Sequence, residues 1–148
     1  MLSKNSADHE KKEKSTYHFP GNIHMRDLDI RSEQVETAVI RFVQSLGIRP
    51  NLAGYHLLID AIITTLRTPD LLKSLTKGLY PIIAKEYGKN ARAVERNMRR
   101  AIDSAFDHDP ERIKSVFYYK VGKPYISEVI SMAVETIRIE SFSGKERQ

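Results

Sequence analysis

Six side chains able to contact nucleic-acid bases lie within nine residues near the middle of the chain. A guanidinium group can donate two hydrogen bonds to guanine O6 and N7, an asparagine amide can pair bidentately with adenine, and a carboxylate can accept from cytosine N4. The set therefore predicts contacts with base edges in the DNA major groove. Its members are Arg92, Glu95, Arg96, Asn97, Arg99 and Arg100.

The same residues fall on one side of a predicted amphipathic helix over about residues 91–106. At about 100° per residue, the four arginines and Asp103 gather opposite an apolar stripe, with Glu95 and Asn97 toward the two flanks. A plain surface helix is the alternative, since Glu95–Arg99 and Arg92–Glu95 have the spacing of intrahelical ion pairs. Four arginines beside one carboxylate exceed what such pairing uses. The apolar stripe consists of Ala91, Val94, Met98, Ala101, Ile102 and Ala105.

A second predicted helix, over residues 79–87, precedes this one and ends at Gly88, and Asn90 is placed to cap the next helix. Two helices joined by a tight turn that contains glycine are typical of a helix-turn-helix. In that motif the first helix crosses the DNA backbone, where basic side chains contact phosphates without specifying sequence. The residues expected in this role are Lys77, Lys85 and Lys89.

The charge of the chain is concentrated in this region. The whole chain of 148 residues has 24 basic and 19 acidic residues, a net charge of +5. The segment from Arg67 to Arg100 alone holds nine basic and three acidic residues, a net charge of +6. A polyanionic partner is therefore expected at this segment rather than over the whole surface.

No residue pattern indicates an enzyme, a metal site or a cofactor. The chain has no cysteine, its five histidines lack ligand spacing, and its seven glycines form no phosphate-binding loop. No nucleophile–base pair and no small-molecule site is evident. Asp60 lies in an apolar helical stretch, which leaves open a buried carboxyl with a shifted pKa, an outward-pointing side chain or a contact with an arginine.

The periodicity of the remaining chain is helical, and we expect an all-α bundle of about six helices that contains the helix-turn-helix. Ser32 is the expected N-cap of the first helix, Gly47 its end, and Thr68 and Asp109 are expected caps before proline. Residues 1–31 are expected to form a flexible tail, 32–141 one helical domain, and 142–148 a frayed end. The expected helices cover about residues 32–46, 50–66, 69–75, 79–87, 91–106, 110–117 and 127–140.

No membrane span and no secretory signal is recognisable in the sequence, so a cytoplasmic protein associated with the nucleoid is expected. Residues 17–31 contain scattered apolar side chains, and we consider that they drape over the domain or join two copies of the chain.

Several short motifs connect these elements to a known family. They are Leu79-Tyr80-Pro81, Ile83-Ala84-Lys85, Val94-Glu95-Arg96, Arg99, Ala101-Ile102, Gly54-Tyr55, Lys123-Pro124, Ser127-Glu128 and Ile137-Arg138-Ile139-Glu140. Through them, residues 33–141 resemble the C-terminal DNA-binding effector domain of the stage 0 sporulation protein A family of response regulators. The resemblance implies a six-helix domain that binds a short DNA box with the helix at 91–106. Glu95, Arg96 and Arg99 fall on the family's recognition positions.

The resemblance also implies partners: double-stranded promoter DNA, a second copy bound head to tail on tandem sites through the last helix, and RNA polymerase. Ala93 stands where the family usually has an arginine, and Asn97 and Arg100 also depart from its pattern, so the preferred DNA sequence is expected to differ. About 31 residues precede the first expected helix, fewer than the family's receiver domain requires. Phosphorylation-gated dimerisation is therefore not expected within this chain.

Two functions follow as hypotheses. The first is a sequence-specific DNA-binding transcription regulator that lacks a receiver. The second is a protein-interaction module that pairs with a full-length sporulation regulator and modulates it. Ala93 favours the second hypothesis, and the retained arginines Arg96, Arg99 and Arg100 favour the first.

Overall fold

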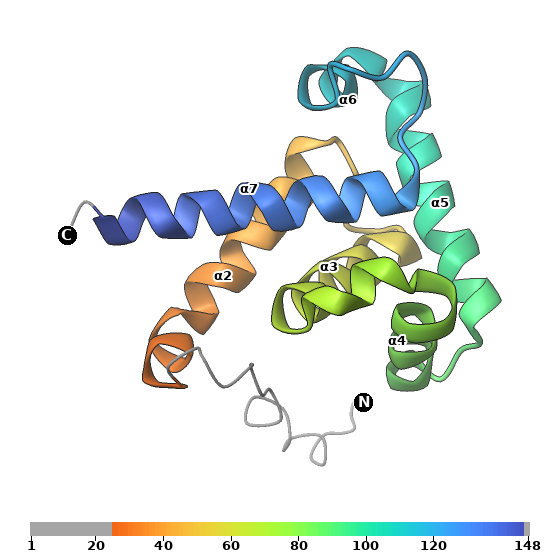
Figure 1. Cartoon of the computed structure of the whole chain (residues 1–148). Helices are drawn as coiled ribbons and strands as arrows, with labels where there is room; N and C mark the ends of the chain where they lie inside the picture. The colour runs from red at the N-terminus through yellow and green to blue at the C-terminus, as the bar shows by residue number, and fades with distance from the viewer. Residues whose placement is uncertain (1–24, 147–148) are drawn as a thin grey trace.

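The chain folds into helices joined by short turns (Figure 1). The computed structural model describes residues 25–146, with side chains from residue 32 to 141, and contains no strand in that part of the chain. This confirms the prediction of an all-α bundle. The elements are α2 (Met25–Ser45), α3 (Ala53–Arg67), the 3-10 helix η2 (Pro69–Lys73), the π-helical turn η3 (Leu75–Leu79), α4 (Tyr80–Tyr87), α5 (Ala91–His108), α6 (Pro110–Val116) and α7 (Ile126–Glu146).

Helix α3 is the centre of the bundle, as the breadth of its apolar arc predicts. It packs against α2, α4, α5 and α7. Its buried residues cover most of its circumference, and the buried hydroxyl of Thr65 donates a hydrogen bond of 2.8 Å to the Ala61 carbonyl. Gln44 of α2 donates to the Tyr55 hydroxyl at 3.0 Å, which ties α2 to α3.

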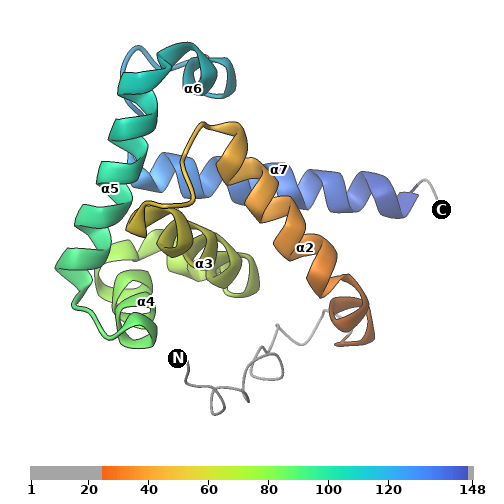
Figure 2. The same cartoon turned by 180° about the vertical axis from the view of Figure 1, so that it is seen from behind.

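The arrangement leaves α5 at one end of the molecule. Helix α7 runs across α2, and its C-terminal end points away from α5, as seen from both sides (Figures 1 and 2). The apolar face of α7 is buried, as its periodicity predicts, through Val129, Ile130, Ala133, Val134 and Ile137. One side of α5 therefore packs on the bundle and the other faces solvent.

Several helix limits differ from the sequence expectation. Helix α2 begins at Met25 rather than Ser32, because no proline or glycine interrupts the chain between Met25 and Gly47 and the helix can propagate through Ser32. Helix α7 likewise continues to Glu146, past the expected end at 140. Much of the predicted tail and the last part of the predicted frayed end lie outside the described residues, at 1–24 and 147–148.

The start of α3 and the segment before α4 also differ. Pro50 and Asn51 form a turn, and α3 begins only at Ala53. The expected helix over 69–75 is a 3-10 helix that ends at Lys73 and is followed by the π-helical turn. Thr68 and Asp109 occupy the predicted cap positions, but neither side chain makes a capping hydrogen bond.

Candidate nucleic-acid interface

A tight turn joins α4 to α5 and sets the direction in which α5 leaves it. Gly88 adopts a left-handed conformation (φ 64°) at the end of α4, which glycine accommodates because it has no Cβ. Asn90 then caps α5, its Oδ1 accepting a hydrogen bond of 2.8 Å from the Ala93 amide. Pro81 lies in the first turn of α4, where its missing N–H costs nothing. The predicted helix-turn-helix is thus confirmed as a local structure.

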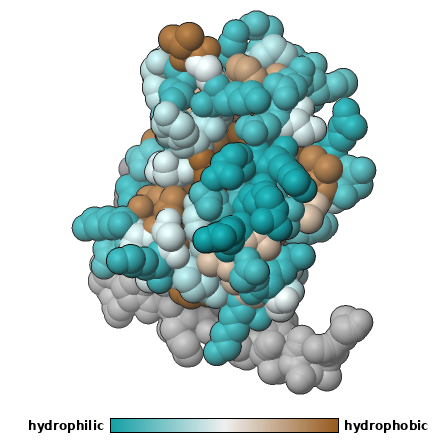
Figure 3. All heavy atoms as spheres, turned by 90° about the vertical axis from the view of Figure 1, so that its right-hand side faces the viewer, coloured by the Kyte–Doolittle hydropathy of each residue, from teal (hydrophilic) through white to brown (hydrophobic). Residues whose placement is uncertain are grey.

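Helix α5 divides into a buried face and a basic, solvent-facing one. Its buried residues are the predicted apolar stripe, apart from Ala91, which is half-buried. Hydrophilic side chains fill the middle of the face of the molecule over which α5 lies (Figure 3). The predicted contact residues on this helix are exposed or, for Glu95 and Asn97, half-buried; the exposed ones are Arg92, Arg96, Arg99 and Arg100.

The four arginines differ in their electrostatic environment. Arg99 forms an ion pair of 2.5 Å with Glu95, one turn earlier on α5. This pair is one of the two intrahelical ion pairs expected if α5 were a plain surface helix. Arg92, Arg96 and Arg100 have no carboxylate within 4.0 Å among the described residues. Three uncompensated guanidinium groups therefore remain on the exposed face, a donor array suited to phosphates and guanine edges.

The basic character of this face ends near Arg100. Lys123, in the segment before α7, reaches Asp107 at 3.3 Å and Asp103 at 4.0 Å. These two carboxylates stand one turn apart on the exposed side of α5, so their spacing in the sequence already marks the limit of the basic face. The sequence analysis noted Asp103 on this side but did not foresee Lys123 as its partner.

A shallow groove of about 400 Å³ follows one flank of α5. Tyr80, Glu95, Arg99 and Tyr125 are among the residues that line it. The pKa of the Tyr80 phenol is raised to about 12, chiefly by burial. The neighbouring Glu95 carboxylate also raises this pKa, and Arg99 lowers it by a smaller amount. Tyr80 therefore stays a neutral hydroxyl beside the Glu95–Arg99 pair at any physiological pH.

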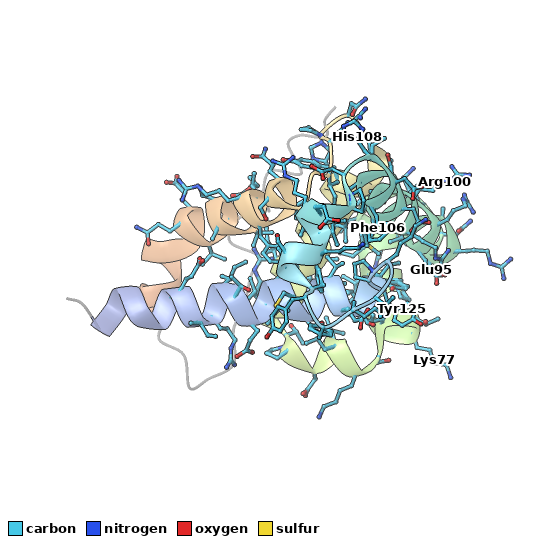
Figure 4. The ribbon with its side chains drawn as sticks, turned by 90° about the horizontal axis from the view of Figure 1, so that it is seen from above. Lys77, Glu95, Arg100, Phe106, His108 and Tyr125 are labelled. Carbon is cyan, nitrogen blue, oxygen red and sulfur yellow. The ribbon has the colours of Figure 1, made fainter. Side chains whose placement is uncertain are left out.

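The three predicted phosphate-contacting lysines are exposed, and none has an ion-pair partner within the described residues. Lys85 lies on α4 and Lys89 in the turn, as expected. Lys77 lies on η3 rather than on the helix before α5, because the chain forms a π-helical turn there. Lys77, Glu95 and Arg100 nevertheless lie along the same side of the molecule (Figure 4).

The contact between α3 and α5 fixes how far α5 stands from the core. Gly54, in the first turn of α3, lies so close to α5 that a Cβ added to it would be 2.2 Å from the Asn97 carbonyl oxygen and 2.7 Å from Ala101 Cβ. Only glycine permits this approach. Gly54 of the Gly54-Tyr55 motif thus determines how closely the basic helix packs against α3.

Asp60 of α3 is the perturbed carboxyl that the sequence left open. Its side chain is half-buried and accepts a hydrogen bond from the Tyr87 hydroxyl at the end of α4. Burial raises the pKa of Asp60 above its usual value, while the Tyr87 hydrogen bond and the charges of His56 and Arg67 lower it by less. The hydrogen bond joins α3 to α4 and is therefore a contact between two elements of the fold.

Within residues 25–146, no group of three or more histidine, aspartate or glutamate side chains is placed to bind a metal ion. In the same part of the chain, no helix combines the length and apolarity that crossing a membrane requires.

Comparison with known protein families shows to which family this helical domain belongs. The family model described as Sporulation initiation factor Spo0A C terminal matches residues 39–137. The chain belongs to this family. The match spans α3, α4, α5 and α6 completely, together with most of α7, and thereby includes the whole helix-turn-helix.

Membership of the Spo0A C-terminal family identifies the chain as a DNA-binding effector domain of the sporulation-regulator type, with DNA as its partner and transcription regulation in sporulation as its role. The family is one of DNA-binding domains and not of enzymes. The resemblance expected over residues 33–141 is confirmed over nearly that range.

Proposed function

We propose that this Spo0A C-terminal family member is a sequence-specific transcription regulator that inserts α5 into the DNA major groove. The supporting observation is the set of three uncompensated arginines, Arg92, Arg96 and Arg100, on a helix whose opposite face is buried in the bundle. Such a helix can enter the groove only with its arginines toward the bases. Arg96 lies at the centre of the exposed arc and is the foremost candidate for a bidentate contact with guanine.

The other predicted side chains complete this interface. Lys77, Lys85 and Lys89 would contact phosphates and position α5 without specifying sequence. Asn97 would serve as an adenine-contacting amide at one flank. Glu95 would accept from cytosine, in which case its ion pair with Arg99 has to be shared with the base or replaced by it.

The test is a binding series on a DNA site selected in vitro from a random duplex pool with the wild-type chain. We expect Arg96→Ala to weaken binding to the selected site by about 1–3 kcal/mol and to relax sequence choice at one position. Lys85→Ala should weaken binding equally on selected and scrambled duplexes. Arg41→Ala, at an exposed position of α2, is the matched control and should bind as wild type does.

If Arg96→Ala keeps both the affinity and the sequence preference of wild type, α5 is not the base-contacting helix. A selection that enriches no common sequence would contradict sequence-specific binding altogether.

Assembly on DNA is part of the same proposal. A tandem homodimer would form through α7, whose Ile139 is 54% exposed although it lies next to the buried Ile137. Two adjacent sites on one duplex should then bind two copies with higher affinity than isolated sites, and Ile139→Glu should remove this gain in a mobility-shift titration. RNA polymerase, at the nucleoid, is the further partner that such a regulator would contact.

The second candidate function is a module that pairs with a full-length sporulation regulator. It is favoured by Ala93, which stands at the position of a family arginine, and by the ion pair that occupies Arg99. This function requires weak DNA binding by the chain alone and tight association with the effector domain of such a regulator. Titration calorimetry with that domain, with and without duplex DNA, separates the two functions.

A further inference from the structure

The connection between α2 and α3 descends from the end of α2 and approaches α5 where α3 begins, as seen from behind the molecule (Figure 2). At its end, Gly54 meets the Asn97 carbonyl. Near its beginning, Gly47 lies under the side chain of Arg112 on α6, whose Cδ and Nη1 atoms would be 3.4 Å and 3.6 Å from a Cβ at Gly47. Residues 47–54 therefore lead from Arg112 of α6 to the middle of α5.

A different flank of α5 faces the start of α4. On that side, Tyr80 shares a groove with Glu95 and Arg99. At about 100° per residue, Ala101, whose Cβ faces Gly54, and Glu95 project from α5 about 120° apart. The basic face of α5 therefore has the η3–α4 segment on one side and the α2–α3 connection on the other.

Two arginines of this second side carry no compensating charge. Arg49, in the connection, and Arg112, which covers Gly47, are both exposed, and no carboxylate of the described residues lies within 4.0 Å of either guanidinium group. Asn51, two residues after Arg49, is exposed as well. These residues lie outside the segment of highest charge in the sequence, and only the fold brings them beside α5.

The dimensions of DNA give this arrangement a consequence. The B-DNA major groove is about 12 Å wide, and a helix with its side chains is about 10–12 Å across, so a helix in the groove has a sugar–phosphate backbone on each side. Lys77, Lys85 and Lys89 lie on the η3–α4 side. We propose that Arg49 and Arg112 bind phosphates of the opposite backbone, so that the domain contacts the DNA backbones on both sides of α5.

This inference rests on the proposed function, since it requires α5 to occupy the groove. It adds a phosphate-binding site formed by the α2–α3 connection and α6, two elements outside the helix-turn-helix. Because phosphate contacts carry no sequence information, the site should contribute equally on every duplex.

The test measures affinity for the selected duplex and for a scrambled one at several salt concentrations, using the whole chain. We expect Arg49→Gln combined with Arg112→Gln to weaken binding to both duplexes by the same factor. Two lost phosphate contacts should reduce the slope of log K against log salt by about 1.8. Between 50 and 200 mM salt, the double variant should therefore lose about 12-fold less affinity than wild type does.

Arg41→Gln, on α2, is the matched control for loss of one surface charge and should leave the slope unchanged. Arg49→Gln and Arg49→Lys are also compared as single variants. Arg49→Lys keeps the charge and should keep the salt slope. If Arg49→Lys loses as much DNA affinity as Arg49→Gln does, Arg49 has a local structural role and the proposal is overturned. Circular dichroism and thermal unfolding of each variant confirm that the fold is retained.

The outcomes separate this inference from the function on which it rests. If Arg96→Ala relaxes sequence choice at one position while the double variant keeps the wild-type affinity and slope, α5 contacts the bases and the second phosphate site does not exist. If wild type binds no duplex, both proposals are wrong.

Discussion

Replacing Gly54 with alanine tests how closely α5 is seated on α3. The new Cβ would lie 2.2 Å from the Asn97 carbonyl oxygen, 2.9 Å from the Asn97 carbonyl carbon and 2.7 Å from Ala101 Cβ. Two of these three contacts are with the backbone of α5, which cannot move aside as a flexible side chain would. The two helices must therefore separate by about 1 Å, which loosens their shared core contacts.

Two opposing terms determine the size of the effect. Alanine is favoured over glycine within a helix by about 1 kcal/mol, which taken alone would stabilise the variant. Overpacking a core contact costs about 1–3 kcal/mol, and a clash with rigid backbone belongs to the upper part of that range. We expect the free energy of unfolding to fall by about 1–2 kcal/mol in net.

Urea denaturation followed by circular dichroism measures this loss. With an m-value of about 2 kcal/mol/M, the midpoint should fall by about 0.5–1 M. Gly122→Ala is the control, since no atom lies within 4 Å of a Cβ at Gly122 and its φ is not in the left-handed region. A Gly54→Ala protein as stable as wild type would refute the close approach of α3 and α5.

Two further predictions concern the helices around the interface. Gly88→Ala should lower the free energy of unfolding by about 1 kcal/mol and Gly88→Asn by less, because only the left-handed backbone penalises them: no atom lies within 4 Å of the added Cβ. Equal stability of both variants and wild type in urea would contradict this. Asp60→Asn tests the raised pKa of Asp60. Between the usual value of 3.8 and the raised one, the folded chain holds this proton more tightly than the unfolded chain, so the carboxyl's contribution to stability falls as pH rises through that window. The stability of wild type relative to Asp60→Asn should therefore decrease with pH there, and a difference independent of pH would show an unshifted carboxyl.

Helical periodicity was sufficient to predict the fold class and the main elements, because apolar residues that must be buried recur at every third or fourth position of each helix. Val94, Met98 and Ile102 are buried as that pattern requires. Some helix limits were harder to predict, because a good capping residue such as Ser32 is not an obligatory cap and the helix continues through it. At Asp109 the predicted start is correct, although the side chain makes no capping hydrogen bond.

The candidate interface was predictable where it lies on one continuous segment. Gly88, Asn90 and the arginines of α5 have local roles, set by the turn, the cap and the helical repeat. The ion pair of Glu95 with Arg99 also follows from their spacing of four residues. Lys77 lies two residues before the predicted helix, on a π-helical turn that the sequence did not indicate, since such turns have no distinct sequence pattern.

The sequence by itself determined that the chain is helical, that it contains a helix-turn-helix, and which side of α5 is basic, because these properties depend on neighbours within about two helical turns. Tertiary structure alone decided which distant residues meet that helix. Gly54 permits a close helix contact only because α3 crosses α5 there, and Lys123 pairs with Asp103 and Asp107 only because the chain returns to α5. Arg49 reaches the flank of α5 for the same reason: packing brings together segments whose separation along the chain carries no local pattern.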